Sequence, residues 1–150
     1  MPSGKVHDAV NLALLPFAIL TPEPFEPLML TAGYLVGTLL LSPDLDLSSS
    51  RVAMRWGLLR AIWLPYAKVA AHRRISHVPI VGLTVRMTYI CIFVGLVLAL
   101  LTVCGIKIDL NPKGMLLRHA FSFALGMFIA DTLHIALDVL VSSAKKLMSK

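Results

Sequence analysis

The chain has few cysteines and few charged residues, and both shortages narrow the class of protein. Only 2 of its 150 residues are cysteine. Cys91 and Cys104 lie in one apolar run and lack the spacing of a thiolate zinc site or a redox pair, which excludes a disulfide framework and a sulfur-ligated metal. We interpret both as small, buried hydrophobic residues.

The shortage of charge excludes an ordinary soluble domain. Charged residues make up 15% of the chain and hydrophobic residues 57%, whereas soluble domains have about a quarter charged. With a mean hydropathy of +0.81, this composition indicates an integral membrane protein in a single domain, residues 1–150. The net charge of +6 is unevenly spread in a way that a membrane explains better than nucleic acid, so we expect no nucleic-acid partner.

We expect no cleaved signal peptide in the first apolar segment. Lys5 precedes the first apolar segment, as in a signal peptide, but no small-residue cleavage site follows. The segment ends instead at "TPEPFEP", whose three prolines cannot continue a helix. We therefore expect the first segment to be a retained helix.

Four apolar segments predict an all-α membrane bundle of about four helices. They cover residues 5–20, 28–42, 79–104 and 115–141. The last two are long enough to span the roughly 30 Å hydrocarbon core of a bilayer, whereas the first two are short for that. Two full spans with a short hairpin remain an alternative to four full spans.

Residues 51–70 predict an amphipathic helix in the membrane interface, between the second and third segments. Aromatic residues beside arginines are typical of such a helix, and Pro65 should kink it. Apolar residues recur at spacings of four and three, which is one helical face. That face consists of Val52, Trp56, Leu59, Trp63, Tyr66 and Ala70.

Basic residues gather on one side of the membrane if the chain runs up and down. By the positive-inside rule, that side is the cytoplasm. Arg86, early in the third segment, can extend its side chain toward the same side. The other basic residues of this side are Lys5, Arg51, Arg55, Arg60, Lys68, Arg73, Arg74, Lys145, Lys146 and Lys150.

Histidines and carboxylates within apolar sequence fall on the same side. Singly, each has a structural explanation such as a helix cap or stop, but their convergence from four segments predicts a metal site. The nine residues are His7, Asp8, Asp44, Asp46, His72, His77, Asp131, His134 and Asp138.

Local spacings support this prediction. Asp131, His134 and Asp138 are three and then four residues apart, so they form one polar stripe of a membrane helix, which is a functional-site hypothesis by default. Asp44 and Asp46 point the same way if the chain is extended after the helix-ending Pro43, as we expect.

The ligand types limit the metal without fixing it. Carboxylates and imidazoles without thiolates suit zinc, manganese, iron or magnesium. The number of candidates leaves room for one or two divalent ions, or for one ion with carboxylates that orient its histidines.

Five motifs, taken in order, resemble a known family. "MPSGKVHD", "SPDLD", "RWGLLRAIWLPY", "HRRISH" and "ADTLHIALD" are similar to a small bacterial family of metal-binding membrane proteins, related to predicted membrane-bound metal-dependent hydrolases. The resemblance covers the chain almost end to end. It implies Asp131 in a supporting role and metal ligands at His7, Asp44, Asp46, His72, His77, His134 and Asp138.

We therefore predict a metal-dependent hydrolase embedded in a bacterial inner membrane or another energy-type membrane, with its metal site facing the cytoplasm. The metal would lower the pKa of a bound water, and Asp131 or Asp8 would accept the proton. The expected substrate is an amphiphilic ester such as an anionic lipid or a polyprenyl phosphate. Arginines including Arg55 and Arg60 would clamp its phosphate, although membrane orientation and attraction to anionic lipids explain them equally well.

Two other classes remain open. A non-catalytic, metal-stabilised scaffold, or a small subunit of a homo-oligomer or larger membrane complex, would need the same ligands but a closed coordination shell. A metal carrier would need polar residues that continue to the far side, where the sequence offers few.

Overall fold

The computed structural model describes residues 3–20, 24–70, 78–106 and 115–149. This part of the chain is all-α and contains no strand, which confirms the predicted class. It has six α-helices and two 3-10 helices: α1 (Gly4–Ile19), α2 (Pro27–Leu39), η1 (Pro43–Asp46), α3 (Arg51–Arg55), η2 (Gly57–Trp63), α4 (Leu64–Ala70), α5 (Pro79–Val103) and α6 (Met115–Met148).

Helix ends follow local sequence signals. Pro27 and Pro79 occupy the first turn of α2 and α5, where the missing N–H of proline costs nothing. Gly105 ends α5 in the left-handed region at φ +83°, a conformation that glycine adopts readily. The bounds of α1, α2 and α5 agree with the predicted segments within three residues, whereas α6 continues beyond the predicted end at residue 141.

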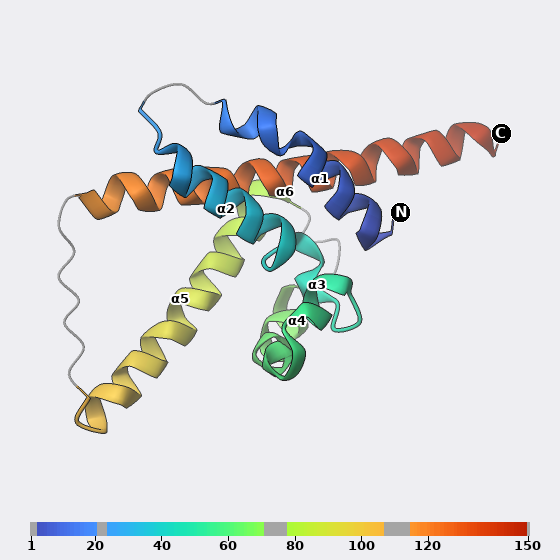
Figure 1. Ribbon diagram of the computed structural model, residues 1–150. Coiled ribbons are helices and arrows are strands. Elements are labelled where there is room, and N and C mark those ends of the chain that lie inside the picture. The colour runs from blue at the N-terminus through green and yellow to red at the C-terminus, as the bar shows by residue number, and fades with distance from the viewer. Residues whose placement is uncertain (1–2, 21–23, 71–77, 107–114, 150) are drawn as a thin grey trace.

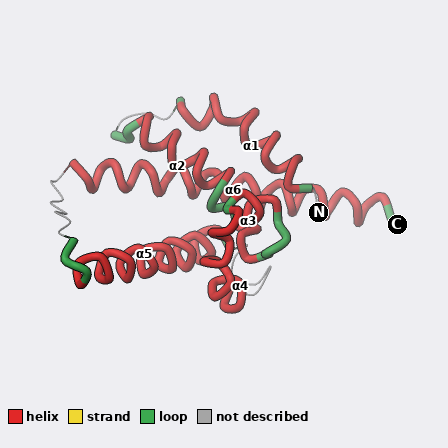
Figure 2. Tube along the Cα trace, turned by 60° about the horizontal axis from the view of Figure 1, so that its bottom comes forward, coloured by secondary structure: helices red, strands yellow, loops and turns green. Residues whose placement is uncertain are grey.

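The long helix α6 organises the molecule (Figure 1). The helix α2 packs along it more extensively than any other element, and α1 contacts both. The C-terminal end of α5 lies apart from this group in the ribbon of Figure 1 and in the tube of Figure 2. The start of α1 and the end of α6 lie at the same end of the molecule (Figure 1), as the sequence predicts.

The backbones of α2 and α6 touch where two glycines face the partner helix. A Cβ atom on Gly33 would lie 1.9 Å from the carbonyl oxygen of Phe123, and one on Gly126 would lie 2.0 Å from that of Leu30. Gly37 follows one turn after Gly33, and small residues four apart are typical of close contacts between membrane helices. Only glycine therefore permits this crossing.

The prediction of one interfacial helix over residues 51–70 is wrong. The segment consists of α3, η2 and α4, and the chain turns at Gly57, whose φ is +54°. Ser50 caps α3 by accepting a hydrogen bond from the backbone N–H of Ala53. The break therefore comes from a left-handed glycine rather than from Pro65.

The predicted apolar face of this segment turns mostly into the protein. Trp63 and Tyr66 are 2% exposed and pack against Tyr89 of α5, whereas Leu59 is 59% exposed. The aromatic side chains pack into the protein core. Their helical spacing therefore marks residues that pack against other helices, and not only a face turned toward the membrane. Buried members of this face are Val52, Trp63, Tyr66 and Ala70.

Two described helices are long and apolar enough to cross a membrane: the parts Ile80–Val103 of α5 and Leu117–Met148 of α6. Only 6% of the most apolar window of α5 is buried inside the protein. Cys91 lies within α5 and Cys104 directly follows it, and both are exposed. The prediction that they are buried is wrong, because no other described element covers them.

We predict that Gly33→Ala lowers the free energy of unfolding by about 1–3 kcal/mol or more, because the added methyl group must push α2 and α6 apart. Thermal unfolding in detergent, followed by helical circular dichroism, measures this. The matched control is Gly95→Ala on α5, where an added Cβ meets nothing within 4 Å. The control should be neutral or stabilising by up to about 1 kcal/mol, and equal stability of wild type and both variants would contradict the close crossing.

Candidate metal centre

Two helices bring three ligating side chains together. His7 lies in the first turns of α1, and His134 and Asp138 lie one turn apart on α6. One ligand atom from each lies within 4.8 Å of the others, and all three residues are buried. Two members of the predicted stripe of α6, His134 and Asp138, therefore face the start of α1.

The 3-10 helix η1 adds a fourth side chain. Asp44 Oδ1 lies 3.6 Å from His134 Nε2, and the Asp44 side chain is 21% exposed, against 5% for His134. The Ser42 hydroxyl lies 3.4 Å from the other nitrogen of the same ring, His134 Nδ1. We call His7, Asp44, His134 and Asp138 the polar cluster; it reaches the surface on the side of Asp44.

The two imidazoles of the polar cluster stack, with ring centroids 3.8 Å apart and an interplanar angle of 16°. Burial and the neighbouring His134 lower the pKa of His7. Since the neutral form of imidazole is the one that binds metals, the surroundings of His7 favour the ligating form.

The donor set fits a divalent metal. His7 Nε2 lies 3.2 Å from Asp138 Oδ1, and His134 Nε2 lies 3.9 Å from Asp138 Oδ2. Two donors that each lie about 2.1 Å from one ion can be at most about 4.2 Å apart, so these pairs can share one. His7 Nδ1 is buried and, among the described residues, has no hydrogen-bond partner.

The two aspartates of "SPDLD" do not point the same way. The predicted extended chain is wrong here, because Pro43 begins a 3-10 turn closed by a hydrogen bond from the Leu45 N–H to the Ser42 carbonyl. With about three residues per turn, side chains two apart point in different directions.

Asp46 is buried and does not belong to the group of His7, His134 and Asp138. Burial raises the pKa of the Tyr66 hydroxyl, and the charge of Asp46 adds to this shift. The other two predicted ligands, His72 and His77, lie outside the described residues.

Asp131 is engaged by an arginine. Arg86 Nη2 of α5 donates to Asp131 Oδ2, and the two side chains are 0% and 2% exposed. Arg86 does not extend to the surface as predicted, because its guanidinium pairs with a carboxylate inside the protein. Among the described residues, Arg86 Nε and Nη1 and Asp131 Oδ1 have no further hydrogen-bond partner.

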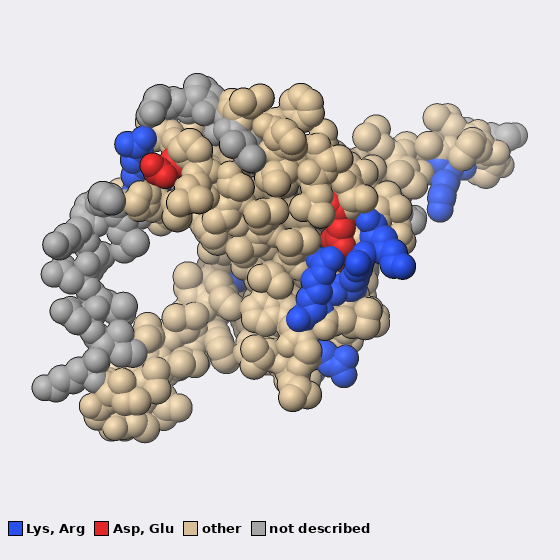
Figure 3. All heavy atoms as spheres, in the orientation of Figure 1, with Lys and Arg blue, Asp and Glu red and all other residues tan. Residues whose placement is uncertain are grey.

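Asp8 is also paired, but nearer the surface. Arg55 approaches it with both terminal nitrogens, Nη1 at 3.3 Å from Oδ1 and Nη2 at 2.5 Å from Oδ2. Arg51 Nη1 lies 3.3 Å from Oδ2. In Figure 3, basic side chains lie next to a small acidic spot over this part of the molecule. The α1–α3 contact therefore holds the residue next to His7 in place.

Asn11 is a buried positioning residue that was not predicted from the sequence. Its side-chain amide donates to the Thr38 hydroxyl at 3.3 Å and to the Ala130 carbonyl at 3.2 Å, and the backbone carbonyl of Asn11 accepts from the Tyr34 hydroxyl at 2.7 Å. Asn11 thus ties α1 to α2 and α6. Its sequence signal is a polar residue four after His7, on the same face of an apolar helix.

Comparisons with known proteins agree with a metal-binding role. A family model described as "Uncharacterized metal-binding protein (DUF2227)" matches residues 2–148. An "Uncharacterized protein" of Aquifex aeolicus (strain VF5) is 37% identical, over 76% of this chain and 90% of the relative. No solved structure matches the chain.

We predict that Arg86→Met destabilises the protein by roughly 3–5 kcal/mol, because it leaves the Asp131 carboxylate buried without its counter-charge. The double variant Arg86→Met/Asp131→Leu should recover most of that loss, since it removes both charges. Thermal unfolding in detergent compares the three proteins. A single variant as stable as wild type, or a double variant less stable than the single, would contradict the buried pair.

Proposed function

Since the chain belongs to the family of uncharacterized metal-binding proteins (DUF2227), we propose that it is a membrane-embedded protein that holds a divalent metal in the polar cluster and hydrolyses an amphiphilic phosphoester there. The observation that carries this proposal is the convergence of two imidazoles and two carboxylates from α1, η1 and α6. Burying carboxylates is costly unless they are paired or bind a cation.

The placement in a membrane rests on α5 and α6. At about 1.5 Å per residue, the 25 residues of α5 extend over about 38 Å, more than the roughly 30 Å hydrocarbon core. On α6, His134 lies 19 residues after Met115, about 28 Å along the axis. If the hydrocarbon begins near Met115, the polar cluster lies at the opposite boundary.

The side of the membrane follows from charge. Lys145 and Lys146 lie beyond the polar cluster on α6, and Arg51 and Arg55 lie beside Asp8. A boundary rich in Lys and Arg faces the cytoplasm in most membrane proteins, so we place the polar cluster at the cytoplasmic interface.

The surrounding residues have separate roles in this mechanism. A bound divalent metal supplies a water molecule whose pKa is lowered toward neutrality. Ser42 fixes the ring of His134 through its Nδ1 contact. Of the two candidate proton acceptors, both paired with arginine, we favour Asp8, because its side chain is 12% exposed against 2% for Asp131.

A non-catalytic scaffold is the second candidate, and burial favours it. His7, His134 and Asp138 are each at most 6% exposed, and they join elements at opposite ends of the sequence. A metal that fastens α1 to α6 would stabilise the bundle without any reaction. The two functions differ in whether water can reach the metal. A hydrolase needs an open coordination position for water, and the partly exposed Asp44 is where water could enter the polar cluster.

We predict that the full-length protein, purified in detergent without chelator, contains a stoichiometric divalent metal. Asp138→Asn and His134→Ala should each lose it, because both residues contribute donors to the polar cluster. Elemental analysis by mass spectrometry measures metal per chain and identifies the ion. The control is His119→Ala, 15 residues before His134, or about 22 Å along α6, which should retain the metal. Metal-free wild type would contradict the site.

Removal and return of the metal separates the hydrolase from the scaffold. Chelation should lower the Tm in both cases, since a ligand at a hundred times its Kd stabilises a fold by about 2.7 kcal/mol. Only the hydrolase should release phosphate from a micellar phosphoester after metal is restored, and Asp138→Asn, purified identically, should not. Restored Tm without turnover of any amphiphilic phosphoester would assign the scaffold role.

A further inference from the structure

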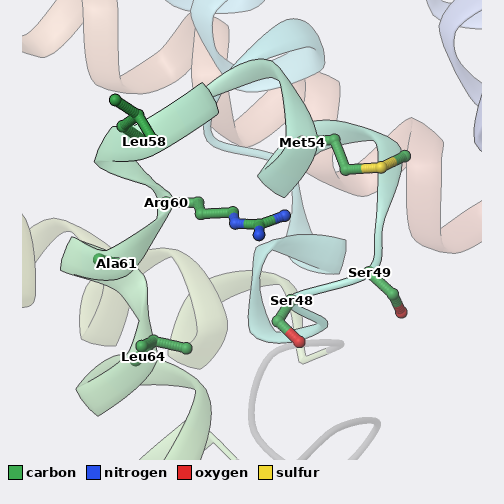
Figure 4. A pocket seen from close by; sticks show the side chains of 7 residues that line it. All are labelled: Ser48, Ser49, Met54, Leu58, Arg60, Ala61 and Leu64. Atoms are coloured by element: carbon green, nitrogen blue, oxygen red, sulfur yellow. The ribbon is translucent and has the colours of Figure 1, made fainter.

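A surface pocket of about 570 Å³ lies beside the segment that follows η1 (Figure 4). Its polar residues come from two places: Ser48 and Ser49 from that segment, and Arg60 from η2. In Figure 4 the Arg60 side chain extends from η2 toward the segment that carries the serines. Its apolar residues include Met54, Leu58 and Leu64.

Arg60 gives this pocket a positive charge. Arg51 and Arg55, on the preceding helix, are held by Asp8. Among the described residues, no ion pair or hydrogen bond engages the Arg60 side chain, and the pocket is lined by no carboxylate. A guanidinium suits a phosphate group, which accepts hydrogen bonds from it, and the serine hydroxyls of the pocket lining are further donors of a kind that phosphate accepts.

The apolar rim of the pocket is turned outward. Leu58 is 97% exposed, Met54 55% and Leu64 51%. Such side chains beside an arginine are typical of a surface in contact with the boundary between lipid headgroups and acyl chains. A polar base with an apolar rim matches an amphiphile better than a soluble anion.

We propose that this pocket binds the phosphate group of an anionic membrane lipid, with its acyl chains along the exposed leucines. None of the polar cluster lines the pocket, so binding requires no metal. Ser48 nevertheless follows Asp44 by four residues, and a chain of that length spans at most about 14 Å. A lipid phosphate is thereby held near the exposed edge of the polar cluster.

Attraction of a basic segment to anionic lipids is the simpler explanation, and it makes a different prediction. General attraction depends on the number of basic residues near the surface and contributes about equally for each. A built pocket depends on one residue. Lys68 of α4 offers the matched comparison, because it is exposed, belongs to the same segment and does not line the pocket.

The experiment titrates the full-length protein, in a neutral detergent, with phosphatidylglycerol, with phosphatidylcholine and with inorganic phosphate, and counts bound lipid by native mass spectrometry. We expect phosphatidylglycerol to bind to wild type and to Lys68→Gln with equal affinity. Arg60→Gln should bind it roughly tenfold more weakly, as expected for a lost hydrogen bond to a charged group. Inorganic phosphate should not compete at equal concentration.

Three results would overturn the proposal: equal losses in Arg60→Gln and Lys68→Gln, which indicate general attraction; competition by inorganic phosphate at equal concentration, which indicates a site for a free anion; and equal binding of phosphatidylcholine and phosphatidylglycerol. Ser48→Ala/Ser49→Ala changes only exposed side chains and should also weaken binding. If Arg60→Gln does not give a monodisperse protein with native circular dichroism, the double serine variant tests the pocket in its place, and unchanged lipid binding by that variant would overturn the proposal.

Discussion

The backbone contact between α2 and α6 at Gly33 and Gly126 fixes the geometry of the rest of the molecule. The chain passes from α2 directly into η1, which carries Asp44, while α6 carries His134 two turns after Gly126. If larger residues held α2 and α6 apart, Asp44 and His134 would move apart by about the same distance as the helices. The closeness of two backbones therefore sets the distance between two donor atoms.

Much of the fold follows from local sequence, and the remainder depends on contacts between distant segments. Long apolar runs and helix-breaking prolines predict α1, α2 and α5, because these signals act within a few residues. The His134–Asp138 stripe is likewise a matter of helical spacing. The direction of the 51–70 aromatic face and the partner of Arg86 were not predictable, because both depend on packing against α5 and α6.

Two buried groups of charged and imidazole side chains, both within the part of the chain that the structure describes, differ in their charge balance. Arg86 and Asp131 neutralise each other between α5 and α6. The polar cluster instead combines two carboxylates with two imidazoles, one of which, His7, is surrounded so as to favour its neutral form. In the first group the two charges balance within the chain. The second has a donor set and charge that suit an added cation. This difference separates residues that hold the helices together from residues that bind a ligand.

The position of the two tryptophans has a spectroscopic consequence. The chain has only two, Trp56 and Trp63, whose rings meet edge to face with centroids 5.2 Å apart. Trp63 packs against Tyr66 and Tyr89, so one indole is enclosed while its neighbour is half-buried at the edge of the same segment. Tryptophan emission from the native protein therefore originates entirely from the α3–η2 region. The unlabelled chain carries its own fluorescent reporter for that region.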